Sequence, residues 1–104
     1  MTRLEEGQEE RIKEAVRARM KEYSFRNDVA FRSEIAPYIE ANEHVVNIGF
    51  SILCTKWEVG YPGGGFVQAI VSNNLMEAFG RADSINLNAI GFYVYLIYNQ
   101  GYVS

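Results

Sequence analysis

Residues 85–98 read INLNAIGFYVYLIY and follow directly on Asp83 and Ser84. The run from Phe92 to Tyr98 is rich in aromatic and β-branched residues, which is typical of a β-strand. The segment is nevertheless longer than most strands, and an Asp-Ser pair at its start is typical of a helix cap. A single strand would also lack a partner elsewhere in this chain. We therefore predict a buried helix over 85–98, with a strand as the alternative.

The beginning of the chain predicts a charged amphipathic helix over residues 3–22. Thr2 and Glu5 form a T-x-x-E capping box, which is a common helix start. We interpret the charged faces as solvated rather than as a docking surface. If they do dock a protein, Arg17 and Arg19 are the candidate contact residues. The apolar stripe of this helix comprises Leu4, Ile12, Val16, Met20 and Tyr23.

A short helix is expected next, capped by Asn27 or Asp28 and running through Ala36, where Pro37 would end or kink it. Such a helix would turn apolar residues toward the interior. These residues are Phe31, Ile35, Tyr38 and Ile39.

Residues 43–99 predict an apolar helical core. A mostly buried helix over 43–58 would end at Gly60, and the glycine-rich run that follows suits a tight connector. From Phe66 a second helix is expected to continue to about Ala82. Its apolar face comprises Val67, Ile70, Val71, Leu75, Ala78, Phe79 and Ala82. The sequence thus predicts an all-α fold, a compact bundle of about four to five helices in a single domain over residues 1–104.

Charge is distributed unevenly along the 104 residues, whose net charge is −3. Residues 1–43 hold eight of the ten basic and ten of the thirteen acidic residues. The remaining 61 residues carry only five charges, too few for an ordinary solvated surface. We therefore predict that the N-terminal part covers the second half and that the chain forms a homo-oligomer. Neither half carries a basic block, so generic nucleic-acid binding is not expected.

The composition also suggests a location. The first residues are charged and unlike a secretory signal. No apolar run approaches the roughly 18 residues of a membrane span, and a single cysteine cannot form an internal disulfide. A cytoplasmic protein without a membrane partner is the expectation.

No residue set typical of an enzyme is present. His44 and Cys54 are the only residues of their types, and ten positions along one helix would place them at poorly matched angles. Cys54 is interpreted as a core residue and His44 as a surface or capping residue. No metal-ligand spacing, nucleophile elbow or P-loop occurs. We therefore expect no catalysis, no metal and no cofactor.

The run Gly63-Gly64-Gly65-Phe66 is the one motif with a binding mechanism. It directly precedes a predicted helix, whose first N–H groups carry partial positive charge and could hold a phosphate or carboxylate. Arg81 or Lys56 could neutralise such a ligand, and aromatic side chains such as Tyr61, Phe66 or Trp57 could stack on a base. The alternative is that the three glycines only permit a sharp turn between helices.

Asparagines in the second half are supporting candidates. Asn73 and Asn74 fall within a predicted helix, where asparagine is a poor helix former. Arg81, Asp83 and Asn86 could form a polar network where the last helix begins. A structural network is the favoured interpretation of these residues, and ligand contact is the alternative.

Residues 62–99 resemble a pattern of small uncharacterised phage and prophage proteins. The matching stretches are Pro62-Gly63-Gly64-Gly65-Phe66, Ser72-Asn73-Asn74-Leu75, Gly80-Arg81-Ala82-Asp83-Ser84-Ile85-Asn86 and Leu96-Ile97-Tyr98-Asn99. This chain has one extra glycine in the turn, and Asn74 stands where the pattern usually has aspartate. The resemblance favours a helix over 85–98.

The resemblance implies a setting in which the protein inhibits host antiviral defence. In one hypothesis it sequesters a phosphate-bearing nucleotide signal at the glycine-rich helix start. In the alternative it blocks a host defence protein by direct contact, as inhibitors of CRISPR complexes do. A structural or assembly role is the third hypothesis.

Overall fold

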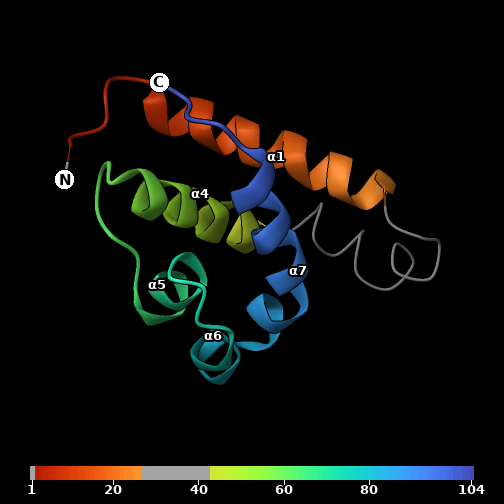
Figure 1. The fold of residues 1–104 in the computed structure, drawn as a ribbon. Helices are drawn as coiled ribbons and strands as arrows, with labels where there is room; N and C mark the ends of the chain where they lie inside the picture. The colour runs from red at the N-terminus through yellow and green to blue at the C-terminus, as the bar shows by residue number, and fades with distance from the viewer. Residues whose placement is uncertain (1, 27–42) are drawn as a thin grey trace.

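The computed structural model describes residues 2–26 and 43–104, which form five helices and no strand. The helices are α1 (Gln8–Arg26), α4 (Glu43–Trp57), α5 (Gly65–Val71), α6 (Leu75–Arg81) and α7 (Ser84–Asn99), labelled as in Figure 1. Together they make a compact globule, which confirms the all-α prediction. The predicted helix over 85–98 is confirmed as α7.

Helix α4 lies at the centre and packs against α1, α5 and α7. In Figure 1, α1 runs along one side of α4, α5 and α6 lie on the other, and α7 crosses beside it. Apolar side chains from α1, α4, α5 and α7 meet in one core. The largest fully buried members are Tyr93, Phe92, Ile12, Met20, Ile52, Leu53 and Leu96.

Gly49 lies where three helices of this core pack closely together. A Cβ at this position would lie 2.8 Å from Cγ1 of Val16 on α1 and 3.3 Å from Cδ2 of Leu96 on α7. Both neighbours are fully buried and have no room to retreat. The missing side chain of Gly49 therefore sets the distance at which three helices meet.

The predicted start of the first helix was wrong. Helix α1 begins at Gln8, and residues 3–5 are not helical. The side chain of Gln8 accepts a hydrogen bond from the Glu5 N–H at 2.8 Å. Thr2 pairs instead with Val59 in an isolated parallel bridge. The tertiary pairing of the chain start with the turn after α4 outweighs the local capping preference of Thr2 and Glu5. The stripe of Ile12, Val16 and Met20 is buried as predicted.

The continuous helix expected from Phe66 to Ala82 was also wrong. Asn73 adopts a left-handed conformation with φ of 62°, which asparagine tolerates better than most residues. The side chain of Asn74 then caps α6 by accepting the Glu77 N–H at 3.2 Å. The chain therefore breaks into α5 and α6, and Leu75 and Phe79 are exposed rather than buried.

The start of α7 is fixed by a polar cluster. Asp83 caps the helix by accepting the Asn86 N–H at 2.7 Å. Asn86 is buried, and its side-chain oxygen accepts the Tyr93 hydroxyl at 2.7 Å. His44 Nε2 lies 3.2 Å from Asp83 Oδ2 and so ties α4 to this junction. The structural network that the sequence predicted here is formed by Asp83 and Asn86, but Arg81 pairs with Glu77 instead.

One expectation remains outside these observations. The predicted short helix from residue 27 or 28 to Ala36, with Phe31, Ile35, Tyr38 and Ile39 facing inward, lies outside the described residues. In the described part of the chain, no helix is both long enough and apolar enough to cross a membrane.

Two helical glycines are predicted to respond oppositely to substitution. Gly49→Val should lower the free energy of unfolding by about 2 kcal/mol, because it overpacks the junction with Val16 and Leu96. Gly80→Ala in α6 should raise it by about 0.5–1 kcal/mol, since a Cβ there meets no atom within 4 Å and alanine favours the helix. Urea unfolding followed by circular dichroism measures both. Equal effects of the two substitutions would contradict the close approach at Gly49.

The buried bond between Tyr93 and Asn86 gives a second prediction. Tyr93→Phe should cost about 1–3 kcal/mol of stability, because it leaves the buried Asn86 oxygen without this donor. The matched control is Tyr98→Phe on the same helix, where the side chain is 84% exposed. It should change stability by less than about 0.5 kcal/mol. Thermal unfolding of both variants provides the comparison, and a neutral Tyr93→Phe would contradict it.

Candidate functional site

A hollow of about 530 Å³ opens between the start of the chain, α1, α4 and the connector that follows α4. We call it the N-terminal hollow. Apolar groups form most of its wall, which also includes two charged residues and two residues with a hydroxyl group. Its lining residues are Arg3, Leu4, Glu9, Phe50, Ser51, Cys54, Gly60, Tyr61 and Pro62.

The hollow exists because the chain start is fastened beside the turn that follows α4. The Thr2 N–H donates to the Glu58 carbonyl at 3.0 Å, and the Gly60 N–H donates to the Thr2 carbonyl at 2.7 Å. Gly60 has φ of 64°, which glycine adopts without strain. Leu4 packs against Gly60: its Cδ1 and Cγ atoms lie 3.2 and 3.3 Å from the position that a Cβ on Gly60 would occupy. These contacts place Arg3 beside the connector.

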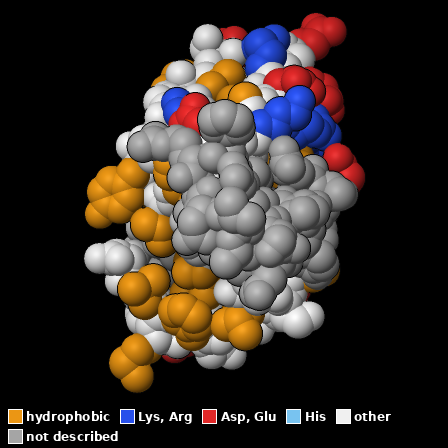
Figure 2. Space-filling model, turned by 90° about the vertical axis from the view of Figure 1, so that its right-hand side faces the viewer, with side chains coloured by type: hydrophobic (Ala, Val, Ile, Leu, Met, Phe, Trp, Pro, Cys, Tyr) orange, Lys and Arg blue, Asp and Glu red, His pale blue; other side chains and the backbone are white. Residues whose placement is uncertain are grey.

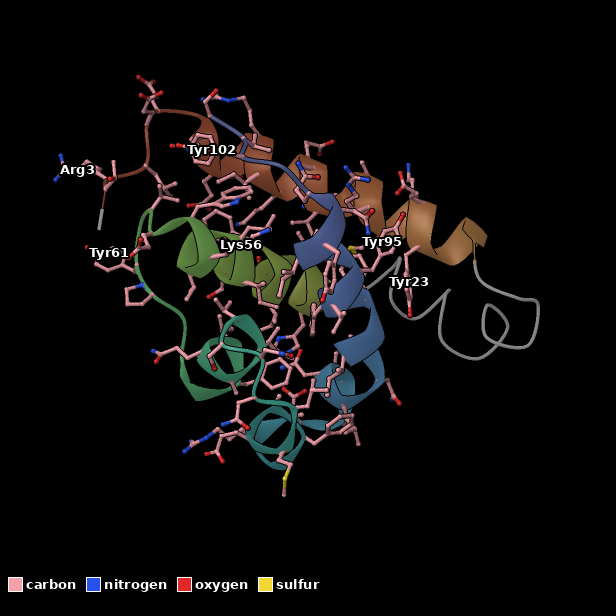
Figure 3. The ribbon with its side chains drawn as sticks, viewed as in Figure 1. Arg3, Tyr23, Lys56, Tyr61, Tyr95 and Tyr102 are labelled. Carbon is pink, nitrogen blue, oxygen red and sulfur yellow. The ribbon has the colours of Figure 1, made fainter. Side chains whose placement is uncertain are left out.

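Arg3 and Tyr61 stand at the mouth of the hollow. Figure 3 shows both side chains at one end of the molecule, pointing outward from two separate segments. Tyr61 is 89% exposed. Arg3 is exposed too, and the ion pairs found within residues 2–26 and 43–104 do not include it. A cation and an aromatic ring are therefore both available to a ligand.

The acidic residue of the hollow has a partner within the protein. Glu9 pairs with Lys13 at 2.9 Å. The Lys13 ammonium also lies 5.4 Å from the centre of the Phe50 ring, in a cation–π contact. Glu9 is therefore held by Lys13, whereas Arg3 has no ionic partner among the described residues. The hollow therefore favours an anionic group at its mouth and an apolar body within.

Cys54 forms part of the apolar wall. Its side chain is buried, and burial raises the pKa of the thiol to about 11, with a further contribution from the negative charge of Glu9. At neutral pH the sulfur is therefore a neutral thiol rather than a nucleophilic thiolate. This fits the sequence interpretation of Cys54 as a core residue.

The glycine-rich connector folds into a tight turn on the other side of Pro62. The Gly63 N–H donates to Thr55 Oγ1 at 2.8 Å, and the Gln68 side chain donates to the Gly63 carbonyl at 2.8 Å. A Cβ at Gly63 would lie 2.4 Å from Val67 Cγ1. Gly63 is thus required for close packing, as the turn alternative predicted. Gly64 is the N-cap of α5, and a Cβ added at this residue would have no other atom within 4 Å.

The structure does bring Arg81 to this connector. Its Nη1 lies 2.9 Å from the position of a Cβ on Gly65. A second, shallower hollow of about 350 Å³ lies there, lined by Gly65, Gln68, Ala69, Ser72, Asn74, Glu77 and Arg81. Arg81 is neutralised by Glu77 at 2.8 Å, so this hollow carries no net charge. Helix α5 spans only seven residues, which limits the field at its start.

The other predicted ligand residues are dispersed. Phe66 is buried and packs edge-on against Tyr93, with ring centres 5.9 Å apart. Trp57 packs against Tyr102, with ring centres 5.1 Å apart, and lines neither hollow. Asn73 makes the left-handed turn, and Asn74 caps α6 while lining the second hollow. Tyr61 lines the N-terminal hollow rather than the second one.

Arg17 and Arg19 do not form one docking patch. Arg17 pairs with Glu14 and Glu43, both at 3.2 Å. Arg19 donates to the Asn99 carbonyl at 2.7 Å and to the Gln100 side chain at 3.0 Å. Arg19 therefore fastens the end of α7 to α1.

Sequence reasoning missed Arg3, Glu9 and Phe50 as site residues. Glu9 and Phe50 lie on α1 and α4, which pack against each other, and the pairing of Thr2 with Val59 brings Arg3 beside them. Nothing in the periodicity of the first helix indicates that pairing. Among the described residues, no three histidine, cysteine, aspartate or glutamate side chains gather where they could hold a metal ion.

Comparison with protein-family models, with curated proteins and with solved structures finds no match to this chain. Its function is therefore inferred from the geometry and chemistry described above.

The raised pKa of Cys54 predicts slow alkylation of the folded protein. Because only the thiolate reacts, the rate with iodoacetamide should climb steadily from pH 8 toward pH 11 rather than level off near pH 9. The same measurement in urea should show a faster reaction with an ordinary thiol profile. A native rate that already levels off near pH 9 would contradict the burial of this thiol.

Proposed function

We propose that the protein is a non-enzymatic binding protein whose N-terminal hollow captures a small ligand with a flat apolar body and an anionic group. Nucleotides are the ligand class that combines these features. The observation that carries the proposal is the position of Arg3, a cation without an ionic partner among the described residues, at the mouth of an apolar hollow.

The size and wall of the hollow support this class. Its volume of about 530 Å³ lies within the range of roughly 300–1,000 Å³ typical of small-molecule sites. Tyr61 and Phe50 offer rings on which a base can stack, and Arg3 can donate hydrogen bonds to a phosphate. The second hollow is a weaker candidate, because Glu77 already neutralises Arg81 there.

A binding role is also supported by the state of the reactive side chains. Cys54 is buried with a raised pKa, and His44 lies against Asp83 at the start of α7. These positions do not suit a nucleophile and its base. Among the described residues that line the N-terminal hollow, Glu9 is the one carboxylate, and it is paired with Lys13.

The resemblance to phage proteins suggests the biological setting. There, capture of a nucleotide signal would weaken a host antiviral defence. Direct inhibition of a host protein through α1 is less well supported, because Arg17 and Arg19 are engaged within the fold.

Isothermal titration with adenosine 5′-monophosphate tests the proposal, with adenosine as the phosphate-free probe. Arg3→Gln should weaken binding of the monophosphate about 10- to 100-fold, as expected for loss of roughly 1.5–3 kcal/mol of charge-assisted hydrogen bonding. The same variant should leave adenosine binding unchanged. Tyr61→Ala should weaken both ligands, since it removes base stacking.

Arg81→Gln is the matched control, because it removes the same charge from the second hollow. It should leave binding of both probes unchanged. Loss of binding in Arg81→Gln with retention in Arg3→Gln would move the ligand to the glycine-rich turn. No binding of the monophosphate at millimolar concentration would contradict the nucleotide assignment.

A further inference from the structure

Charged side chains gather along α1, and one of them reaches the N-terminal hollow. On the face drawn in Figure 2, charged side chains lie at the upper end, where Figure 1 places α1, and hydrophobic side chains lie toward α6. Glu9, in the first turn of α1, lines the hollow together with Arg3. Within residues 2–26 and 43–104, Glu9 pairs with Lys13 and not with Arg3. The hollow therefore presents a cation and a carboxylate at separate places.

Lys13 holds the Glu9 carboxylate near an aromatic ring of the wall. The Lys13 ammonium lies 2.9 Å from Glu9 Oε2 and 5.4 Å from the centre of the Phe50 ring. The negative charge of Glu9 also contributes to the raised pKa of Cys54, which belongs to the same wall. A flat base packed against Phe50 can therefore turn a polar edge toward this carboxylate.

The Glu9 carboxylate accepts hydrogen bonds and donates none, so it suits a ligand edge with two donors side by side. Lys13 donates to Oε2 alone, and each carboxylate oxygen can accept more than one hydrogen bond. Guanine is the common base whose Watson–Crick edge offers two adjacent donors, N1–H and the N2 amino group. Adenine and cytosine instead place an acceptor nitrogen beside their amino group, and that nitrogen would face the carboxylate unpaired.

We propose that Glu9 is a specificity-determining residue, which makes the N-terminal hollow prefer guanine nucleotides over adenine nucleotides. This inference rests on the proposed function of the hollow, with Arg3 binding the phosphate and Glu9 contacting the base. An adenine nucleotide keeps the contacts with Arg3 and with the aromatic rings and loses the paired hydrogen bonds to Glu9. It therefore still binds, but more weakly than a guanine nucleotide.

Isothermal titration with guanosine, inosine and adenosine 5′-monophosphates (GMP, IMP and AMP) tests the proposal. The wild-type chain should bind GMP about tenfold more tightly than AMP, with IMP between them because hypoxanthine lacks the N2 amino group. Glu9→Gln should weaken GMP binding about tenfold and strengthen AMP binding, since an amide offers the acceptor and the donor that adenine requires. Equal binding of GMP and AMP by wild type, or an unchanged preference in Glu9→Gln, would overturn the proposal.

Two further variants separate this inference from the proposed function. Glu10→Gln is the matched control, because it removes the same charge from the next residue of α1, which is exposed and does not line the hollow. It should leave the affinities for GMP and AMP unchanged, and circular dichroism checks that each variant remains helical. Arg3→Gln should weaken GMP and AMP by the same factor and so preserve their ratio. Equal affinities for GMP and AMP that both fall in Arg3→Gln would refute the role of Glu9 while supporting the proposed function, whereas no binding of any monophosphate would overturn both.

Discussion

The packing of three helices around Gly49 is the constraint on which the other features depend. Helix α4 can lie against α1 and α7 only because this position lacks a side chain, with Val16 and Leu96 filling the space from either side. Once α4 is fixed, the turn after it has a fixed place too. Thr2 then pairs with Val59, and that pairing brings Arg3 to the hollow beside α4. The candidate site is therefore a consequence of the core packing.

The connector after α4 contributes residues to both hollows. Gly60, Tyr61 and Pro62 line the N-terminal hollow, while Gly65 lines the shallower hollow beside Arg81. The difference between the two is electrostatic. Arg81 is paired with Glu77, whereas Arg3 has no ionic partner within the described residues. An unpaired cation over an apolar wall is the better site for an anionic ligand, because binding breaks no existing ion pair.

Much of the fold could be predicted from the sequence, because apolar periodicity is a local signal. It located α4 and α7, and the Asp83 cap distinguished helix from strand at residues 85–98. The errors arose where tertiary contacts outweighed local preference. Thr2 pairs with a distant turn instead of capping α1, and the left-handed Asn73 divides one expected helix into two. The site was only partly predictable, since Tyr61 was identified but Arg3 was not, and Arg81 lies in the second hollow. Most of the residues that line the hollow together with Arg3 lie about fifty residues away from it along the chain.

The central claim is that the N-terminal hollow, rather than the glycine-rich helix start, is where a ligand binds. Two-dimensional NMR of the ¹⁵N-labelled chain, titrated with adenosine 5′-monophosphate, locates the contact directly. We predict that the largest amide shifts fall on Arg3, Ser51 and Tyr61, with little change at Gly65 and Gln68. Shifts centred on Gly65, Gln68 and Arg81, with an unperturbed Arg3, would contradict the account.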